Sequence, residues 1–210
     1  MAEAIALLEI EAPPRESFSR RDNGNVPLEE RTDVTVEELE RTSLPYPAEL
    51  YNGKVVFKMA SPEHGILQGR IVTSLNLYLE QKQIGYAMTE TNFRLWPQRS
   101  DQSRIPDIAF VRKDRLPEDL HSYPVLSPDL AIEVVSPEDN FTKVMNKVDA
   151  YLEQGSQLVW LVLPARREVL VCTPANTYSV RDVLTAPELL PGFELPVSKI
   201  FEGLPAHPRA

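Results

Sequence analysis

A glutamate inside an otherwise apolar run is the feature that most constrains this chain. The segment "PDLAIEVVSPEDN" covers residues 128–140, and Glu133 stands in the middle of "LAIEVV". A run that is apolar on both faces is typical of a central strand in a sheet that is covered on both sides. An ionised carboxylate removed from water costs several kcal/mol unless a partner compensates its charge. The sequence therefore predicts a buried carboxylate with a specific partner.

The composition is that of an ordinary globular chain. It has 210 residues, of which 42% are hydrophobic and 25% charged, and this suits one compact domain. No apolar run approaches the roughly 20 residues that span a bilayer, and the first residues carry acids where a secretory signal would carry Lys or Arg. We therefore expect a soluble, cytoplasmic protein that has no membrane partner. The single cysteine, Cys172, excludes a disulfide framework and a cysteine-rich zinc site.

The charge is acidic, with a formal net value of −9. This argues against a protein that coats nucleic acid by bulk electrostatics. A local basic cleft stays open, because six basic residues lie close together in the sequence: Arg94, Arg99, Arg104, Arg112, Lys113 and Arg115. Ordinary solvated surface charge is the alternative for this basic run.

The amino-terminal part divides into an arm and the start of a domain. Residues 1–31 are polar and without a clear period, which predicts a flexible arm, followed by a single domain over 32–204 and a flexible tail over 205–210. Thr35 and Glu38 have the spacing of a capping box, so a short helix should follow Thr35. The Asn-Gly pair in "AELYNGKVVFKMA" predicts a hairpin.

A longer helix should begin after Ser61, which can cap it, with Pro62 at the first helical position. Gly85 is expected to close this helix. Its apolar residues recur every four positions and should cover a sheet: Leu67, Ile71, Leu75 and Leu79.

Strands are expected at "YAMTETNFRLW", "DIAFVR" and "DLAIEVV", and a second helix should start at once after the third strand, with Ser136 as its N-cap. After Gly155 we expect three more strands, "LVWLVL", "EVLVCT" and "TYSVRD", and then an irregular or single-turn segment at "LLPGFELPVSKIF". This order indicates an α/β protein with one mixed sheet flanked by helices. Gly-rich phosphate loops are absent from the sequence.

Two acids mark the candidate chemistry. Asp107 begins one predicted strand and Glu133 lies in another, so their carboxylates converge at one end of the sheet if the strands are neighbours. Two carboxylates near a backbone carbonyl form an oxygen-rich site that suits Mg²⁺ or Mn²⁺. The structural alternatives are that Glu133 pairs with Lys147 or a buried arginine, and that Asp107 caps a turn.

Lys147 is the third candidate residue. At about 100° per residue, it falls on the border of the apolar face of the second helix, whereas Lys143 turns further towards water. From there its ammonium could orient or activate a water and stabilise the charge that develops on a phosphate. The alternative is a solvated helix lysine.

The strings "RIPDIAFV", "PDLAIEVVSPEDN", "KVDAYLEQGSQLVWLV" and "LLPGFELPVSKIF" follow one another in the chain. In this order they resemble the Uma-type "putative restriction endonuclease" family of the PD-(D/E)XK nuclease superfamily. The resemblance runs from about Thr32 to Gly203. It implies a restriction-endonuclease-like core, in which a central mixed sheet is flanked by helices and carries a divalent-metal site at its edge. To this core the residues themselves add an amino-terminal hairpin and a carboxyl-terminal strand extension.

The resemblance also implies roles for single residues. Asp107 matches the first acid of the superfamily and Glu133 the second. The superfamily usually has a lysine two positions after the second acid, where this chain has Val135. Lys147 matches a lysine on the following helix that takes over in the Uma-type pattern.

Many members of the superfamily add another acid from the first helix or the hairpin. Glu49 and Glu63 are the candidates here, with a place on the surface as the alternative for both. His64, in the first helical turn, is a further candidate, with a surface or packing role as its alternative.

Together these features predict a divalent-metal-dependent endonuclease that hydrolyses phosphodiester bonds in DNA. Asp107 and Glu133 would hold one or two Mg²⁺ or Mn²⁺ ions, and Lys147 would position the attacking water. The alternative is a catalytically silent nuclease-like domain that serves as a binding or assembly module, which the acidic charge and Val135 favour. A homodimer is expected by analogy with nucleases that cut both strands.

Overall fold

The computed structural model describes residues 26–205. Residues 1–25 and 206–210 lie outside this range, and with them most of the predicted arm and nearly all of the predicted tail. At the end of the predicted arm, η1 (Leu28–Glu30) is a 3-10 helix, and Leu28 packs against a small amino-terminal core. None of the helices within residues 26–205 combines the length and the apolar character that a membrane span needs.

The main body is built on one mixed sheet of six strands. Across the sheet these are β3 (Gly85–Thr89), β4 (Ile108–Arg112), β5 (Leu130–Val134), β6 (Leu158–Leu163), β7 (Glu168–Cys172) and β8 (Thr177–Val180). Only β5 and β6 are parallel among these neighbouring pairs; the others are antiparallel. The predicted α/β class with a mixed sheet is confirmed.

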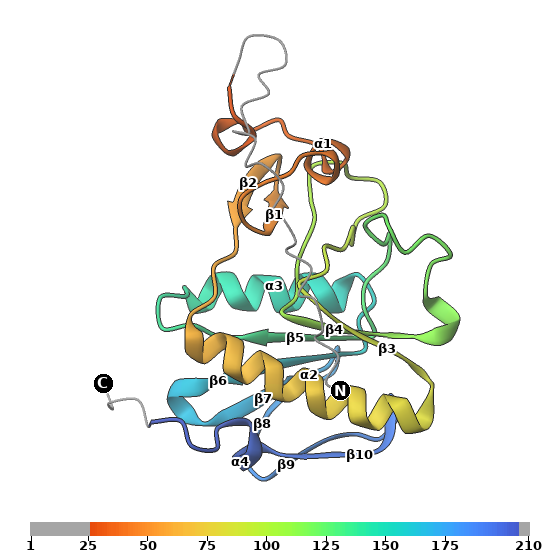
Figure 1. The fold of residues 1–210 in the computed structure, drawn as a ribbon, viewed down its shortest axis with the longest axis vertical. Coiled ribbons are helices and arrows are strands. Elements are labelled where there is room, and N and C mark those ends of the chain that lie inside the picture. The colour runs from red at the N-terminus through yellow and green to blue at the C-terminus, as the bar shows by residue number, and fades with distance from the viewer. Residues whose placement is uncertain (1–25, 206–210) are drawn as a thin grey trace, which may run out of the picture.

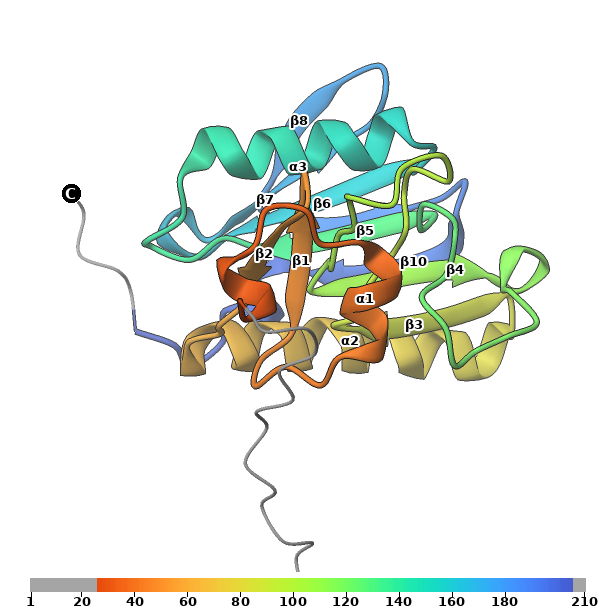
Figure 2. The ribbon, with the colours of Figure 1, turned by 90° about the horizontal axis from the view of Figure 1, so that it is seen from above.

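Two helices cover the two faces of this sheet. Figure 2 shows α2 (Pro62–Lys82) and α3 (Phe141–Glu153) on opposite sides of it. The apolar stripe of α2 packs on one face with Ile132 and Trp160, and α3 packs on the other with Ala131 and Val159. Every residue of β5 is buried, so the prediction of a central strand is confirmed.

A carboxyl-terminal unit completes the core on the α2 face. It consists of β9 (Val183–Ala186), β10 (Leu190–Pro196) and the short helix α4 (Val197–Ile200). The ring of Phe193 stacks on Trp160 at 6.0 Å between centroids and meets Tyr78 edge-on at 5.3 Å. The expectation of an irregular or single-turn segment here is confirmed for the single turn α4 and wrong for the residues before it, because β10 forms an antiparallel hairpin with β9 whose register shifts between Leu190 and Glu194.

The amino-terminal unit stands at the top of Figure 1. The expected hairpin is confirmed as β1 (Ala48–Tyr51) and β2 (Lys54–Phe57), with positive φ at Asn52 and Gly53, as an Asn-Gly turn requires. The capping box between Thr35 and Glu38 is also present and begins α1 (Val36–Arg41).

Three predicted boundaries are wrong. The strand expected at residues 86–96 ends at Thr89, because Glu90 adopts a φ of 50° and turns the chain. The helix α2 is closed by Gln83 in the left-handed conformation. Gly85 instead begins β3, where a Cβ atom would overlap the carbonyl oxygen of Val111.

The third boundary is the start of α3. This helix begins at Phe141, with Asn140 as the N-cap that accepts a hydrogen bond from the backbone N–H of Lys143 at 3.2 Å. Ser136 instead closes a turn, in which its backbone N–H donates to the carboxylate of Asp139 at 2.7 Å. The loop between β5 and α3 is therefore longer than predicted.

Candidate active site

The sheet register brings Asp107 next to Glu133. In the antiparallel pair of β4 and β5, Ile108 is level with Ile132, and Asp107 directly precedes Ile108. Oδ2 of Asp107 accepts a hydrogen bond from the backbone N–H of Val134 at 2.6 Å. Asp107 is 1% exposed and Glu133 is 7% exposed. The two acids therefore lie buried at the same end of the sheet.

Lys147 reaches this end from the second turn of α3. Its Nζ lies 2.9 Å from Oε1 of Glu133, forms an ion pair with Glu49 and donates to the carbonyl oxygen of Ile105 at 2.8 Å. Its side chain is 10% exposed, so Lys147 is not a solvated helix lysine. The hydroxyl of Tyr151, one turn later on α3, donates to the same Oε1 of Glu133 at 2.9 Å.

Lys58 is a second lysine in the site, and the sequence did not reveal it. It directly follows β2, and its Nζ donates to Oδ1 of Asp107 at 2.5 Å and to the carbonyl oxygen of Ile105 at 2.9 Å. The same Nζ lies 3.8 Å from Oε2 of Glu90. Lys58 and Asp107 are 49 positions apart, and no local pattern around the hairpin marks this lysine.

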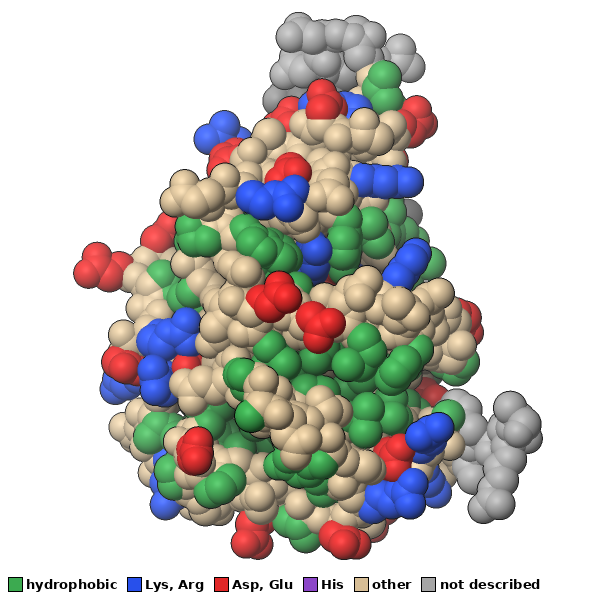
Figure 3. All heavy atoms as spheres, turned by 180° about the vertical axis from the view of Figure 1, so that it is seen from behind, with side chains coloured by type: hydrophobic (Ala, Val, Ile, Leu, Met, Phe, Trp, Pro, Cys, Tyr) green, Lys and Arg blue, Asp and Glu red, His purple; other side chains and the backbone are tan. Residues whose placement is uncertain are grey.

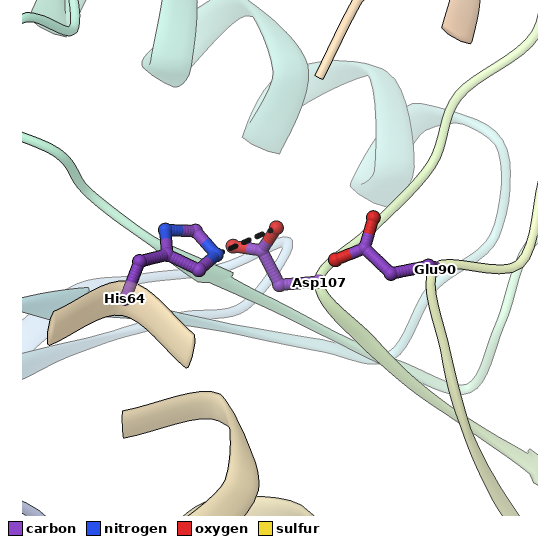
Figure 4. A group of neighbouring side chains, drawn as sticks. All are labelled: His64, Glu90 and Asp107. Atoms are coloured by element: carbon purple, nitrogen blue, oxygen red, sulfur yellow. Dashed lines mark ion pairs between the residues drawn. The ribbon is translucent and has the colours of Figure 1, made fainter. Parts of the chain in front are cut away.

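His64 and Glu90 flank Asp107, as Figure 4 shows. Nε2 of His64 lies 3.2 Å from Oδ1 of Asp107. One ligand atom from each of His64, Glu90 and Asp107 lies within 4.8 Å of the others. Gln68 holds two of these residues in place, because its Nε2 donates to Glu90 and to the backbone carbonyl of Asp107. His64 is 8% exposed, so the surface alternative for it is wrong.

The two acids considered as supplementary ligands differ in position. Glu49, on β1, is 4% exposed, and its Oε1 accepts a hydrogen bond from the backbone N–H of Ile105 at 2.8 Å. The surface alternative for Glu49 is therefore wrong. Glu63, in the first turn of α2, is half-buried.

The acids of this site differ in their pKa values. Burial acts to raise the pKa of Asp107, but the hydrogen bond from His64 and the charge of Lys58 outweigh it and hold that pKa well below its usual range. Burial raises the pKa of Glu133 to about 7, although Lys147 opposes this shift. Burial would also raise the pKa of Glu49, but the charges of Lys147 and Lys58 outweigh burial and lower this pKa. Glu49 is thus the ionised partner of a lysine that it shares with Glu133.

This set of donors fits a hard divalent cation. The carboxylates of Asp107, Glu133 and Glu49 and the carbonyl of Ile105 all present oxygen, which Mg²⁺ and Mn²⁺ prefer. Two ammonium groups lie among these oxygens and provide positive charge there. Because Glu133 does not have a cationic partner of its own, a divalent ion would relieve the cost of burying its charge.

Most of the basic run at residues 94–115 is engaged by partners within the chain. Arg94 pairs with Glu37 and Arg99 with Asp101, while Arg104 is buried with its guanidinium 3.5 Å from the ring centroid of Tyr51. Arg112 and Arg115 pair with Asp129, which precedes β5 and so lies at the end of that strand opposite to Glu133. On the face drawn in Figure 3, acidic and basic side chains are interspersed.

Comparisons with known proteins agree with this fold. The model of a family described as "Putative restriction endonuclease" (Uma2) matches residues 36–198. A crystal structure of a "putative nuclease belonging to DUF820" from Anabaena variabilis ATCC 29413 is similar, with a TM-score of 0.68 and 25% identity, over 80% of this chain and 97% of that chain. No curated protein matches the chain. The family resemblance read from the sequence is confirmed, and the chain belongs to the Uma2 family of nuclease-like proteins.

Proposed function

We propose that this protein is a divalent-metal-dependent endonuclease that hydrolyses phosphodiester bonds in DNA. Membership of a nuclease family supports hydrolysis of nucleic acid in general. The observation that carries the metal dependence is the burial of Glu133, which shares its cationic partner with Glu49 at the sheet end where Asp107 lies. Such a carboxylate is stabilised by an added divalent cation.

Asp107 and Glu133 would hold Mg²⁺ or Mn²⁺, and the carbonyl of Ile105 is a third oxygen next to them. When bound, such an ion lowers the pKa of a water and neutralises charge on a phosphate. Tyr151 fixes the carboxylate of Glu133 through its hydroxyl. Lys147, whose Nζ lies against that carboxylate, is placed to hold a water or a phosphate oxygen by a charge-assisted hydrogen bond.

The test is cleavage of supercoiled plasmid and of single-stranded DNA with Mg²⁺, Mn²⁺ or EDTA. Asp107→Asn and Glu133→Gln should abolish the cutting that the parent shows with metal. Glu80→Gln, which changes an exposed acid in the last turn of α2, is the matched control and should cut like the parent. Equal cutting by the parent, Asp107→Asn and Glu133→Gln would contradict the assignment.

A catalytically silent binding module is the second candidate. It is favoured by the two lysines, which already occupy positions next to Asp107, Glu49 and Glu133 within the chain. A ligand that binds only the folded state raises the melting temperature by mass action. A melting temperature that does not change at millimolar Mn²⁺ would favour the silent module over the nuclease.

A homodimer and a cytoplasmic location stay predictions. Edge strand β8, whose first three residues are exposed, is a candidate surface for pairing between two copies. Sedimentation at several protein concentrations tests this, with a Ser179→Pro change in β8 expected to prevent strand pairing.

A further inference from the structure

We infer that Arg166 and Arg181 form a contact for the phosphate backbone of nucleic acid, beside the candidate active site. The inference rests on the proposed function, because it names a surface that would hold the substrate of the same site. Both arginines pair with one buried acid, Glu168, the first residue of β7.

The acid is buried, whereas the arginines are open to solvent. Glu168 is 2% exposed, while the side chains of Arg166 and Arg181 are 72% and 70% exposed. Arg181 donates to Oε2 of Glu168 from Nε at 2.8 Å, and its Nη2 lies 2.6 Å from the same oxygen. Ser179 also donates to this oxygen, at 2.9 Å. Each guanidinium has five N–H donors, so both keep donors for a second anion.

One arginine is sufficient to compensate Glu168. Arg181 makes both of the short contacts, whereas Arg166 approaches Oε1 only to 3.5 Å. Burial alone would raise the pKa of Glu168, but the hydrogen bonds from Ser179 and Arg181 lower it, so the carboxylate stays charged. Two arginines against one carboxylate leave a net positive charge at this position. The charge of Arg166 is therefore not required to compensate Glu168.

The strand register places this group near Glu133. Glu133 is level with Leu161 on β6, Leu161 is level with Leu170 on β7, and Leu170 is level with Ser179 on β8. Residues two apart on a strand share a face, so Glu168 projects from the same face as Leu170. Since Glu168 is opposite the last residue of β6, it lies at the end of the sheet where β5 also ends.

The separation suits a polyanion that reaches the active site. Glu133 and Glu168 are two strands apart and two residues apart along the strands, which corresponds to about 12 Å at the usual strand spacing and rise per residue. Along a duplex this is about three to four base pairs, at 3.4 Å per step of one strand. The chain has a net charge of −9, and the basic run at residues 94–115 is largely engaged with internal partners. A local positive contact at this end would offset the repulsion of DNA by the acids.

The experiment measures binding of a fluorescent 30-base-pair duplex by anisotropy, in EDTA and in a Glu133→Gln background so that no cutting occurs. The test variant is Arg166→Ala/Arg181→Ala/Glu168→Gln, in which the last change avoids leaving an unpaired buried carboxylate. The matched control, Arg112→Ala/Lys199→Ala/Glu202→Gln, changes the net charge equally. It removes an arginine at the opposite end of the sheet and the ion pair of α4.

The test variant should bind several-fold more weakly, and the slope of log affinity against log salt should fall by about 2, as for two lost phosphate contacts. The control should bind like its background. The inference would be overturned if the test variant bound as tightly as its background, or if the control were weakened equally. It would also be overturned if the Glu133→Gln background did not bind the duplex at 50 mM salt.

Hydrolysis of bis-p-nitrophenyl phosphate with Mn²⁺ separates the two proposals, because this small diester has no extended backbone. With Glu133 intact, the changes at Arg166, Arg181 and Glu168 should leave this hydrolysis at the parent's rate. Hydrolysis by neither protein would count against the proposed nuclease, whatever the result with the duplex. A loss of hydrolysis confined to the arginine variant would overturn the inference.

Discussion

Lys58 and Lys147 donate hydrogen bonds to the same acceptor, the carbonyl oxygen of Ile105, at 2.9 and 2.8 Å. Lys58 pairs with Asp107, and Lys147 pairs with Glu133. The two acids on neighbouring strands are therefore linked through two ammonium groups and one carbonyl. A divalent cation at Asp107 and Glu133 would compete with these lysines for the same oxygens.

Competition of this kind predicts the effect of Lys58→Met. The change should lower the free energy of unfolding of the metal-free protein by about 3 kcal/mol, because it leaves the buried Asp107 without its lysine partner. The rise in melting temperature caused by Mn²⁺ should be larger than in the parent. Denaturant titration and melting curves measure the two effects. Lys54→Met, an exposed lysine of the same hairpin, is the control, and an equal Mn²⁺ effect in Lys58→Met and parent would refute competition.

The raised pKa of Glu133 predicts that the stability of the metal-free protein depends on pH. The pKa of Glu133 is raised from 4.5 to about 7 on folding, so its contribution to stability is fully present below pH 4.5 and is lost as the pH rises through 7. The free energy of unfolding should fall over this window by up to about 3 kcal/mol. In Glu133→Gln, the free energy of unfolding measured by denaturant titration should fall less between pH 5 and 7 than in the parent. An unchanged decline in the variant would show that Glu133 does not titrate in this window.

In Glu133→Gln, a smaller decline of the free energy of unfolding with rising pH should persist at higher pH. Burial acts to lower the pKa of His64, but the hydrogen bond to Asp107 outweighs this and raises it above 6.5. The stability that His64 contributes is therefore present below pH 6.5 and is lost as the pH rises through its raised pKa. His64→Gln in the Glu133→Gln background should remove the remaining slope.

The hydroxyl of Tyr151 should affect both the stability of the protein and the pH profile of metal-dependent cleavage. Tyr151→Phe removes its hydrogen bond to Glu133 and should cost about 1–2 kcal/mol of stability, because both groups are buried. It should also move the pH profile of metal-dependent cleavage to higher pH, since the ionised carboxylate loses a donor. Tyr178→Phe on the exposed face of β8 is the control. A pH profile identical to that of the parent would count against a role for this hydroxyl.

Two glycines should respond to alanine in opposite directions. A Cβ atom at Gly85 would overlap the carbonyl oxygen of Val111 and the ring of Phe110, so Gly85→Ala should destabilise by about 1–3 kcal/mol. Gly69, within α2, has open space around its Cβ position, and Gly69→Ala should stabilise by up to about 1 kcal/mol. Denaturant titration measures both changes. Similar stability in the two variants would contradict the close approach of β3 and β4.

The elements that the sequence predicted correctly are those with a strong local signal. The four-residue stripe on α2, the capping box of α1 and the Asn-Gly hairpin are each set by neighbours within a few positions. Strand β10 was missed because Pro191 and Gly192 interrupt its pattern, and its pairing with β9 shifts at that point. The start of α3 was misplaced because Ser136 and Asn140 are both suitable N-caps, and contacts of Ser136 with Asp139 decide between them.

The residues of the candidate site also divide into those that a local sequence signal marks and those that only the tertiary fold brings together. Asp107 and Glu133 were found because each is an acid next to or within an apolar strand. Lys58 and Glu90 were missed, since each meets Asp107 or its neighbours only through the tertiary fold, as in the contact of Gln68 with Glu90 across 22 positions. Glu49 was a candidate with a surface position left open as the alternative, because a short hairpin gives no sign of which of its residues the rest of the chain covers.

The most direct test is anomalous diffraction from crystals grown with Mn²⁺. The account predicts an ion bound by carboxylate oxygens of both Asp107 and Glu133, with Lys58 or Lys147 moved away from its present partner. An ordered ion bound elsewhere, with Asp107 still paired to Lys58 and Glu133 still paired to Lys147, would contradict it.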